Sequence, residues 1–210
     1  MEEKNNKLFK YILIVSGICI LIVLGVGLGL KYKSYYEVVK KPYAQVGDKI
    51  VSKLEYNYYY VAYQHFYISS YSALFDYMGV DKDKPLEEQQ YDEGRTFGEF
   101  FDESACSRII EMYVLNKDGK EKGLEFDTES KYGSYIRDVQ SACNASHVSV
   151  NKYFENFYGE YATEKRIRPF IIDGYYANLY TDYLIEELGS EEAAYDYIMQ
   201  LREGYEVTFK

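Results

Sequence analysis

The pattern of apolar and polar positions divides the chain into an uncharged N-terminal stretch and a longer part with helical periodicity. Ile12–Leu30 contains no charged residue over 19 positions, and lysines stand on both sides of it. At about 1.5 Å per residue, a helix of this length spans the roughly 30 Å hydrocarbon core of a bilayer. The sequence therefore predicts a transmembrane anchor at residues 11–31, represented by Ile12, Leu21 and Leu30.

Two questions about this anchor stay open on sequence alone. A cleaved signal peptide has an apolar region of about 7–15 residues that ends in an A-x-A-like site. Here the apolar region is longer and ends in Gly25–Leu30, so we favour an uncleaved anchor. Similar numbers of lysines flank both ends, so the positive-inside rule does not decide the orientation. The predicted organisation is a short tail at 1–10, the anchor, a spacer at 32–42 and a domain at 43–210.

The domain opens with a strand, a turn and a helix. Tyr43–Val46 and Lys49–Val51 flank a Gly-Asp pair, a pattern typical of two short strands joined by a turn. Ser52 followed by Glu55 is a capping box, which predicts a helix from Lys53. The helical pattern continues to Met78 and is stopped by Gly79.

Capping residues and breakers predict the helices that follow. Their predicted extents are Thr96 to Gly123, Asp127 to Ala145, Val150 to Tyr158, Thr163 to Gly189 and Ser190 to Gly204. Pro169 predicts a kink or a later start in the fourth of them. Tyr205–Phe209 alternates as a strand does, and a lone strand is unstable, so its expected partner is the strand near Tyr43–Val51. The predicted fold is mainly α: an irregular multi-helix domain closed by a small two- or three-stranded sheet that joins the N- and C-terminal strands.

Tyrosine dominates the composition, with 27 Tyr and 11 Phe but no Trp. On the first predicted helix, one broad arc carries an aromatic stripe. The candidate polypeptide-contacting residues on this stripe are Tyr56, Tyr59, Tyr60, Tyr63, Phe66 and Tyr67. A wide stripe of this kind is typical of a helix that is buried on most sides. It also suits a contact groove, since Tyr combines an apolar face with a polar tip, and both interpretations stay open.

The charge of the domain excludes one class of partner. The net charge is −10, and the first 31 residues carry four lysines against two glutamates, so the remainder carries −12. Such a domain repels phosphate backbones and anionic lipid, which argues against nucleic-acid binding and for a position away from the bilayer surface.

No pattern for catalysis or metal binding is present. The sequence lacks a phosphate-binding glycine loop, a G-x-S-x-G elbow and an H-E-x-x-H pair. The two histidines, His65 and His147, have no ligand at metal-binding spacing, and His65 lies on a polar helix face. We predict no enzyme activity, catalytic residue, metal or cofactor. Cys106 and Cys143 are predicted to be two separate thiols in preference to a disulfide.

Two stretches resemble the helical chaperone domain of SurA/PrsA-type extracytoplasmic foldases. Val46-Gly-Asp-Lys49, leading through Ser52 into a tyrosine-rich helix, resembles the strand–turn–helix that opens that domain. Val148–Tyr153, followed by Tyr158-Gly159 and Thr163-Glu164, resembles a later stretch of it, with His147 where the family pattern has glycine. The similarity covers most of 43–204.

The resemblance implies a function and an orientation. Family members hold extended, unfolded polypeptide in the helical domain and isomerise X-Pro bonds in a separate parvulin domain, of which this sequence shows no pattern. We therefore expect a membrane-anchored chaperone-like protein for newly translocated polypeptides, without isomerase activity. Its N-terminus would be cytoplasmic and its domain extracytoplasmic. The alternative is a cell-surface structural or adaptor protein that docks one fixed protein partner. The sequence predicts neither the client nor the oligomeric state.

Overall fold

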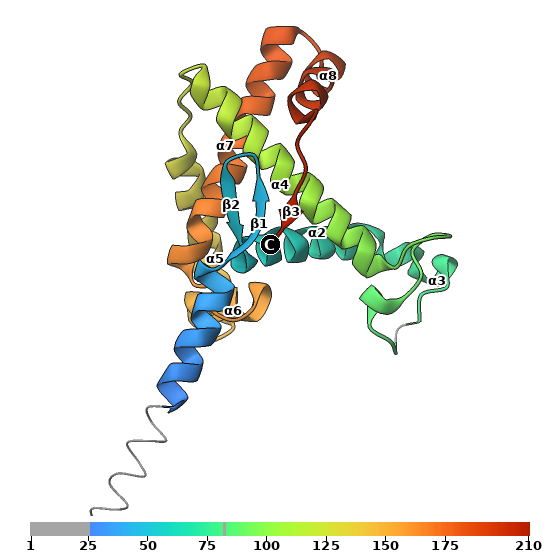
Figure 1. Ribbon diagram of the computed structural model, residues 1–210, viewed down its shortest axis with the longest axis vertical. Helices are drawn as coiled ribbons and strands as arrows, with labels where there is room; N and C mark the ends of the chain where they lie inside the picture. Colours follow the sequence, from blue (N-terminus) through green and yellow to red (C-terminus); the bar gives the residue numbers. More distant parts are fainter. Residues whose placement is uncertain (1–25, 82) are drawn as a thin grey trace, which may run out of the picture. The chain divides into compact units, whose positions relative to one another are not determined.

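The computed structural model describes residues 26–81 and 83–210 (Figure 1). Contacts divide the chain at Pro42 into two compact units. In the described part of the first unit, residues 26–35 are α-helical and continue into the π-helix η1, Tyr36–Lys40. Leu30 is 63% exposed there, whereas Ile12 and Leu21 lie outside the described residues. Among the helices of the described ranges, none is long and apolar enough to cross a membrane.

Residues 42–210 form a mainly helical domain with a small sheet, as the sequence predicts. Its α-helices are α2 Lys53–Tyr71, α3 Phe75–Met78, α4 Phe97–Glu121, α5 Thr128–Ala145, α6 Val150–Tyr158, α7 Glu164–Leu188 and α8 Glu191–Arg202. Its strands are β1 Pro42–Val46, β2 Lys49–Ser52 and β3 Thr208–Phe209. Two 3₁₀ turns, η2 Ser72–Leu74 and η3 Leu86–Glu88, lie between α2 and α4.

The sheet joins the two ends of the domain, which confirms the expected closure. Its strand order is β2-β1-β3, and both pairings are antiparallel. Ala44 pairs with Val51 on one side and with Phe209 on the other. β3 is shorter than the predicted strand Tyr205–Phe209, and the N–H of Tyr205 donates to the carbonyl of Arg202 and not to a neighbouring strand.

The first long helix ends earlier than the sequence predicts. α2 stops at Tyr71, whose backbone (φ −122°, ψ 0°) leaves the helical region, and η2 and α3 carry the chain on to Gly79. The break falls in a serine-rich stretch in which the Ser69 hydroxyl donates to the carbonyl of Phe66. Serine side chains that bond the backbone compete with helix formation, which explains the interruption.

The other helices begin at their predicted caps. Thr96 and Glu99 form both hydrogen bonds of a capping box, and the side chains of Asp127, Ser149 and Ser190 accept from the first turns of α5, α6 and α8. Of the two alternatives that Pro169 predicts, the later start of α7 is wrong, because the helix begins at Glu164 with Pro169 inside it, and the kink stays a prediction. Pro169 is exposed, so the carbonyl it leaves without a helical partner can face solvent.

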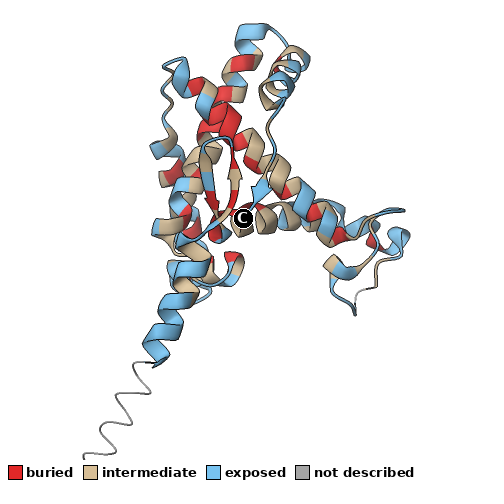
Figure 2. Cartoon of the chain, viewed as in Figure 1, coloured by how far each residue is buried: buried red, intermediate tan, exposed pale blue. Residues whose placement is uncertain are grey.

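Buried residues follow α4 and the sides of α2, α7 and the sheet that face it (Figure 2). The main cluster includes Val46, Tyr59, Ile109, Met112 and Tyr180. A second, smaller cluster of Tyr67, Phe75, Phe97 and Phe101 lies where α3 and the start of α4 meet α2. One group of buried residues therefore lies around the middle of α4 and a smaller one at its N-terminal end, and further buried residues such as Val139, Phe154 and Ile167 lie on α5, α6 and α7.

The Gly-Asp turn between β1 and β2 is locked onto α4 by one tyrosine. Gly47 has a positive φ of 56°, and a Cβ added there would lie 2.3 Å from the Tyr113 hydroxyl oxygen. That hydroxyl donates to Asp48 Oδ1 at 2.7 Å, and this bond lowers the pKa of the Asp48 carboxyl. The close approach of the ring and the left-handed backbone both require glycine at this position.

A largely buried group of one lysine and two carboxylates joins β2, α2 and α7. Lys49 Nζ lies 2.7 Å from Glu55 Oε1 and 3.5 Å from Asp173 Oδ2, and the Glu55 side chain is only 6% exposed. Burial raises the pKa of Glu55 against the opposing effect of Lys49. Burial also disfavours the charge on Lys49, but Glu55 and Asp173 outweigh it, so the pKa of Lys49 is raised. The three charges hold their elements together because none can be separated from its partner cheaply.

We predict that Lys49→Met lowers the free energy of unfolding by about 3 kcal/mol or more, since it leaves the buried Glu55 beside Asp173 without a cation. Glu55→Gln should lower the free energy of unfolding by less, because Lys49 remains paired with Asp173. Urea denaturation of both variants measures the difference. A smaller loss for Lys49→Met than for Glu55→Gln would contradict the described role of the lysine.

We also predict that Gly47→Ala lowers the free energy of unfolding by about 2–4 kcal/mol, from backbone strain and overlap with Tyr113. Gly133→Ala is the matched control, because its added Cβ meets nothing closer than 3.6 Å and it lies inside α5. Alanine favours a helix interior over glycine, so the control should be neutral or stabilising by about 0.5–1 kcal/mol. Equal effects of the two substitutions in denaturation would refute the packing argument.

Candidate functional site

A groove of about 750 Å³ lies between α2 and α4 and reaches α7. Its lining residues are Tyr58, Tyr59, Ala62, Tyr63, Phe66, Arg95, Phe100, Glu103, Ser104, Ser107, Arg108, Glu111, Met112, Phe170 and Gly174. This volume is within the range of about 300–1,000 Å³ that is common for binding clefts.

The α2 wall of the groove is aromatic. Tyr59, Ala62, Tyr63 and Phe66 follow the i, i+3, i+4, i+7 spacing that places side chains on one helix face. Tyr63 is half-buried, with its ring centroid 6.2 Å from that of Phe66 and 5.7 Å from that of Phe100. Phe66 is 58% exposed, so this wall ends in an aromatic ring that solvent reaches.

The α4 wall is mostly polar, and its charges are paired. Arg108 forms an ion pair with Glu111 one turn later on the same helix. Arg202, at the end of α8, donates to the Ser107 hydroxyl at 2.6 Å and lies 3.8 Å from the Glu111 carboxylate. Ser104 donates its hydroxyl to the carbonyl of Phe100 at 2.8 Å. This wall therefore offers hydroxyls and paired charges opposite the aromatic rings.

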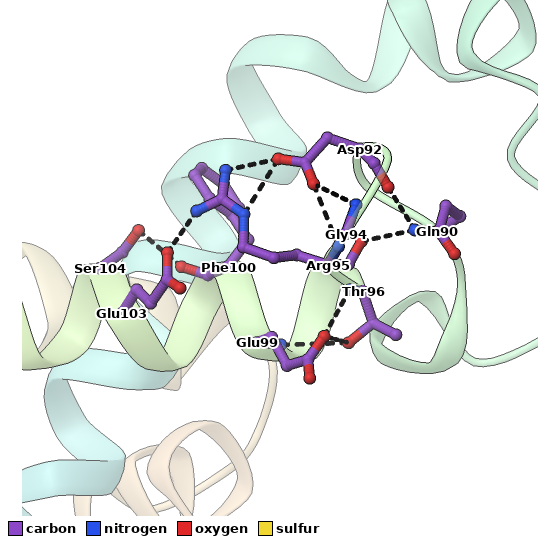
Figure 3. A network of polar contacts seen from close by, with 9 residues as sticks. All are labelled: Gln90, Asp92, Gly94, Arg95, Thr96, Glu99, Phe100, Glu103 and Ser104. Carbon is purple, nitrogen blue, oxygen red and sulfur yellow. Dashed lines mark hydrogen bonds and ion pairs between the residues drawn. The ribbon is translucent and has the colours of Figure 1, made fainter.

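Arg95 lies at the N-terminal end of α4 and belongs to a polar network around the capping box (Figure 3). Its Nε donates to Asp92 Oδ2 at 2.9 Å, and its Nη1 donates to Glu103. The guanidinium carbon is 5.5 Å from the ring centroid of Tyr91 and 6.0 Å from that of Phe100, and these two rings stack at 4.0 Å. Arg95 is therefore held by two carboxylates and two aromatic rings at one end of the groove.

Tyr59 contributes a deeply buried part of the lining. It is 5% exposed, and burial raises its pKa well above the usual value. Its hydroxyl is a buried side-chain polar atom that lacks a hydrogen-bond partner among the described residues. A buried hydroxyl without a partner lowers the stability of the fold.

The structure separates the six candidate contact residues into two groups. Tyr59, Tyr63 and Phe66 line the groove, but Tyr56, Tyr60 and Tyr67 do not. Tyr56 is 6% exposed and donates its hydroxyl to Asp102, and its ring contacts that of Phe209 at 5.7 Å. Tyr60 packs against Phe101, and Tyr67 lies in the smaller cluster. The aromatic stripe is thus partly core and partly groove.

Sequence reasoning missed the second wall of the groove and its end at Arg95. The missed lining residues with large or charged side chains are Tyr58, Arg95, Phe100, Glu103, Arg108, Glu111, Met112 and Phe170. The α4 wall has a signal that could have revealed it, because Phe100, Ser104, Ser107, Arg108 and Glu111 repeat at helical spacing.

His65, Cys106 and Cys143 do not line the groove. His65 is exposed and stacks on Phe157, with ring centroids 4.0 Å apart, in agreement with its prediction as a surface histidine. Cys106 and Cys143 are separate free thiols, as predicted, and burial raises the pKa of Cys106. Within residues 26–81 and 83–210, no group of three or more His, Cys, Asp and Glu side chains could hold a metal ion.

We predict that Tyr59→Phe leaves the free energy of unfolding unchanged or raises it by about 1 kcal/mol, since it removes a buried hydroxyl without a partner. Tyr56→Phe is the matched control and should lower it by about 1–2 kcal/mol, because its hydroxyl donates to the carboxylate of Asp102. Thermal and urea denaturation check both values. A loss at Tyr59 equal to that at Tyr56 would show that the Tyr59 hydroxyl has a partner in solution.

Comparison of the chain with protein-family models, with curated proteins and with solved structures finds no match.

Proposed function

We propose that the domain at 42–210 binds extended polypeptide segments in the groove between α2 and α4. The observation that carries this proposal is the contrast between the two walls. Side chains of an extended chain alternate between two sides. A bound segment can therefore direct apolar side chains to Tyr63 and Phe66, while its backbone and polar side chains meet Ser104 and Ser107.

The chemistry of the walls favours weak recognition of many sequences. Aromatic side chains offer a large contact area for few rotatable bonds, and hydroxyls adapt to either donors or acceptors. The charges of Arg108 and Glu111 satisfy each other, so a segment without charges can bind beside them. These properties support a chaperone-like role in which unfolded chains are held but not chemically altered.

We also propose that residues 11–31 anchor this domain to a membrane, with the N-terminus cytoplasmic and the domain extracytoplasmic. The uncharged stretch Ile12–Leu30 supports the anchor, and the resemblance to SurA/PrsA-type foldases supports the direction. Newly translocated polypeptides are the clients that this position provides. The charge of −12 after residue 31 would keep the domain from lying on anionic lipid.

The groove proposal is tested with Phe66→Ser and Tyr63→Ser in the full-length chain. Each removes an aromatic contact, and we expect the affinity for a fluorescent apolar peptide to fall about five- to tenfold, together with the ability to slow aggregation of an unfolded reporter protein. Tyr195→Ser is the control, because Tyr195 is 62% exposed on α8 and does not line the groove.

Peptide affinity of the control should equal that of the unmodified chain. The groove proposal fails if the unmodified chain binds no peptide and does not slow aggregation. It also fails if Tyr195→Ser weakens binding as much as Phe66→Ser does.

A second candidate function is docking of one fixed protein partner. It is favoured by apolar side chains on α3 and the turn before it, since Leu74 is 51% and Tyr77 is 93% exposed. Isolated exposed residues are common, but neighbouring ones also occur at interfaces. Affinity purification separates the two functions: one stoichiometric partner supports docking, and many weakly bound chains support the chaperone-like role.

A further inference from the structure

Arg95 places a positive charge at one end of the groove. Arg95 is among the lining residues, and its side chain is 38% exposed. Its guanidinium meets the Asp92 carboxylate, the Glu103 carboxylate and the Phe100 ring, and both Glu103 and Phe100 also line the groove. This end of the groove is therefore built to hold a positively charged group against an aromatic face.

The charge around this end exceeds what Arg95 can neutralise. Two carboxylates share its single positive charge. Residues 72–103, here called the acidic segment, contain ten Asp and Glu residues against three Lys and Arg residues. The net charge of the acidic segment is therefore −7, more than half of the −12 that follows residue 31. A second cation arriving at Glu103 would enter a negative potential.

We propose that Arg95 holds the position that a basic side chain of a bound polypeptide takes, so that the groove prefers segments carrying Lys or Arg among apolar residues. This inference rests on the proposed function and names the class of its clients. Exchange is cheap because the ion pairs of Arg95 are partly exposed, and exposed ion pairs are weak. A client cation would take over Glu103 and the Phe100 face while Arg95 keeps Asp92.

Arg95 therefore competes with a basic side chain of the client for Glu103 and the Phe100 ring. Removing the charge of Arg95 should strengthen the binding of a basic peptide. In the full-length chain, Arg95→Gln should tighten binding of a labelled apolar peptide containing two lysines by about two- to fivefold, because the competing charge is gone. Glu103→Gln should weaken binding of the same peptide by a similar factor. If the Arg95–Glu103 pair only stabilised the fold, both substitutions would change the affinity for this peptide in the same direction.

Three controls accompany these variants in fluorescence-anisotropy titrations. The same peptide with both lysines replaced by glutamine should bind both variants and the unmodified chain about equally. Arg95→Lys keeps the charge and should bind the lysine peptide like the unmodified chain. Asp196→Asn removes an exposed carboxylate on α8 that does not line the groove. Because charges this exposed are screened by salt, the affinity for the lysine peptide should stay the same.

The outcomes separate the inference from the function on which it rests. Opposite shifts for Arg95→Gln and Glu103→Gln with the lysine peptide support the inference. The inference is overturned if Arg95→Gln weakens binding of the lysine peptide, or if the lysine and glutamine peptides bind the unmodified chain equally well. If neither peptide binds the unmodified chain, the proposed function itself fails.

Discussion

The arrangement of the domain depends on where a lysine and its carboxylates can be buried together. Lys49, Glu55 and Asp173 belong to β2, α2 and α7, and without Lys49 the charge of Glu55 would be buried and uncompensated. This requirement fixes the direction in which α2 leaves the sheet and the part of α7 that faces it. α2 is held in this way at its N-terminal end, its later turns pack on the start of α4 through Tyr67 and Phe101, and the groove lies between these two helices. The groove is thus positioned by charged residues, of which Glu55 lies about two turns before Tyr63 on α2.

Local chemistry made much of the fold predictable. Caps such as Thr96, Ser149 and Ser190 set the starts of helices because their side chains satisfy backbone donors that no other group reaches. The same reasoning failed at Tyr71, because a serine-rich stretch interrupts the helix without a proline or glycine to announce it. The later start that Pro169 suggested also failed, because a proline on an exposed helix face costs less than one in the core.

The groove was much less predictable than the helices that form it. Tyr56 and Tyr59 lie three residues apart on one aromatic arc, yet Tyr56 packs beside the sheet and only Tyr59 lines the groove. A helical wheel assigns both residues to the same broad face of α2. Only the elements that pack against each residue distinguish them. Those partners come from α4, α7 and the C-terminal strand, which are distant in sequence. Helical periodicity can therefore propose a contact surface but cannot divide it into core and groove.

The pairing of β1 with β3 has a consequence for the order in which the domain assembles. Ala44 and Phe209 are partners, so this pairing closes a loop of 165 residues. The entropic cost of closing a loop rises with its length, and contacts this distant form after local ones have reduced it. During synthesis, β1 emerges before the other elements of the domain and must wait, with one edge unpaired, until β3 is made. In the meantime β2 pairs with the opposite edge of β1, so the hairpin with its turn at Gly47 can form early and leaves one edge open for β3.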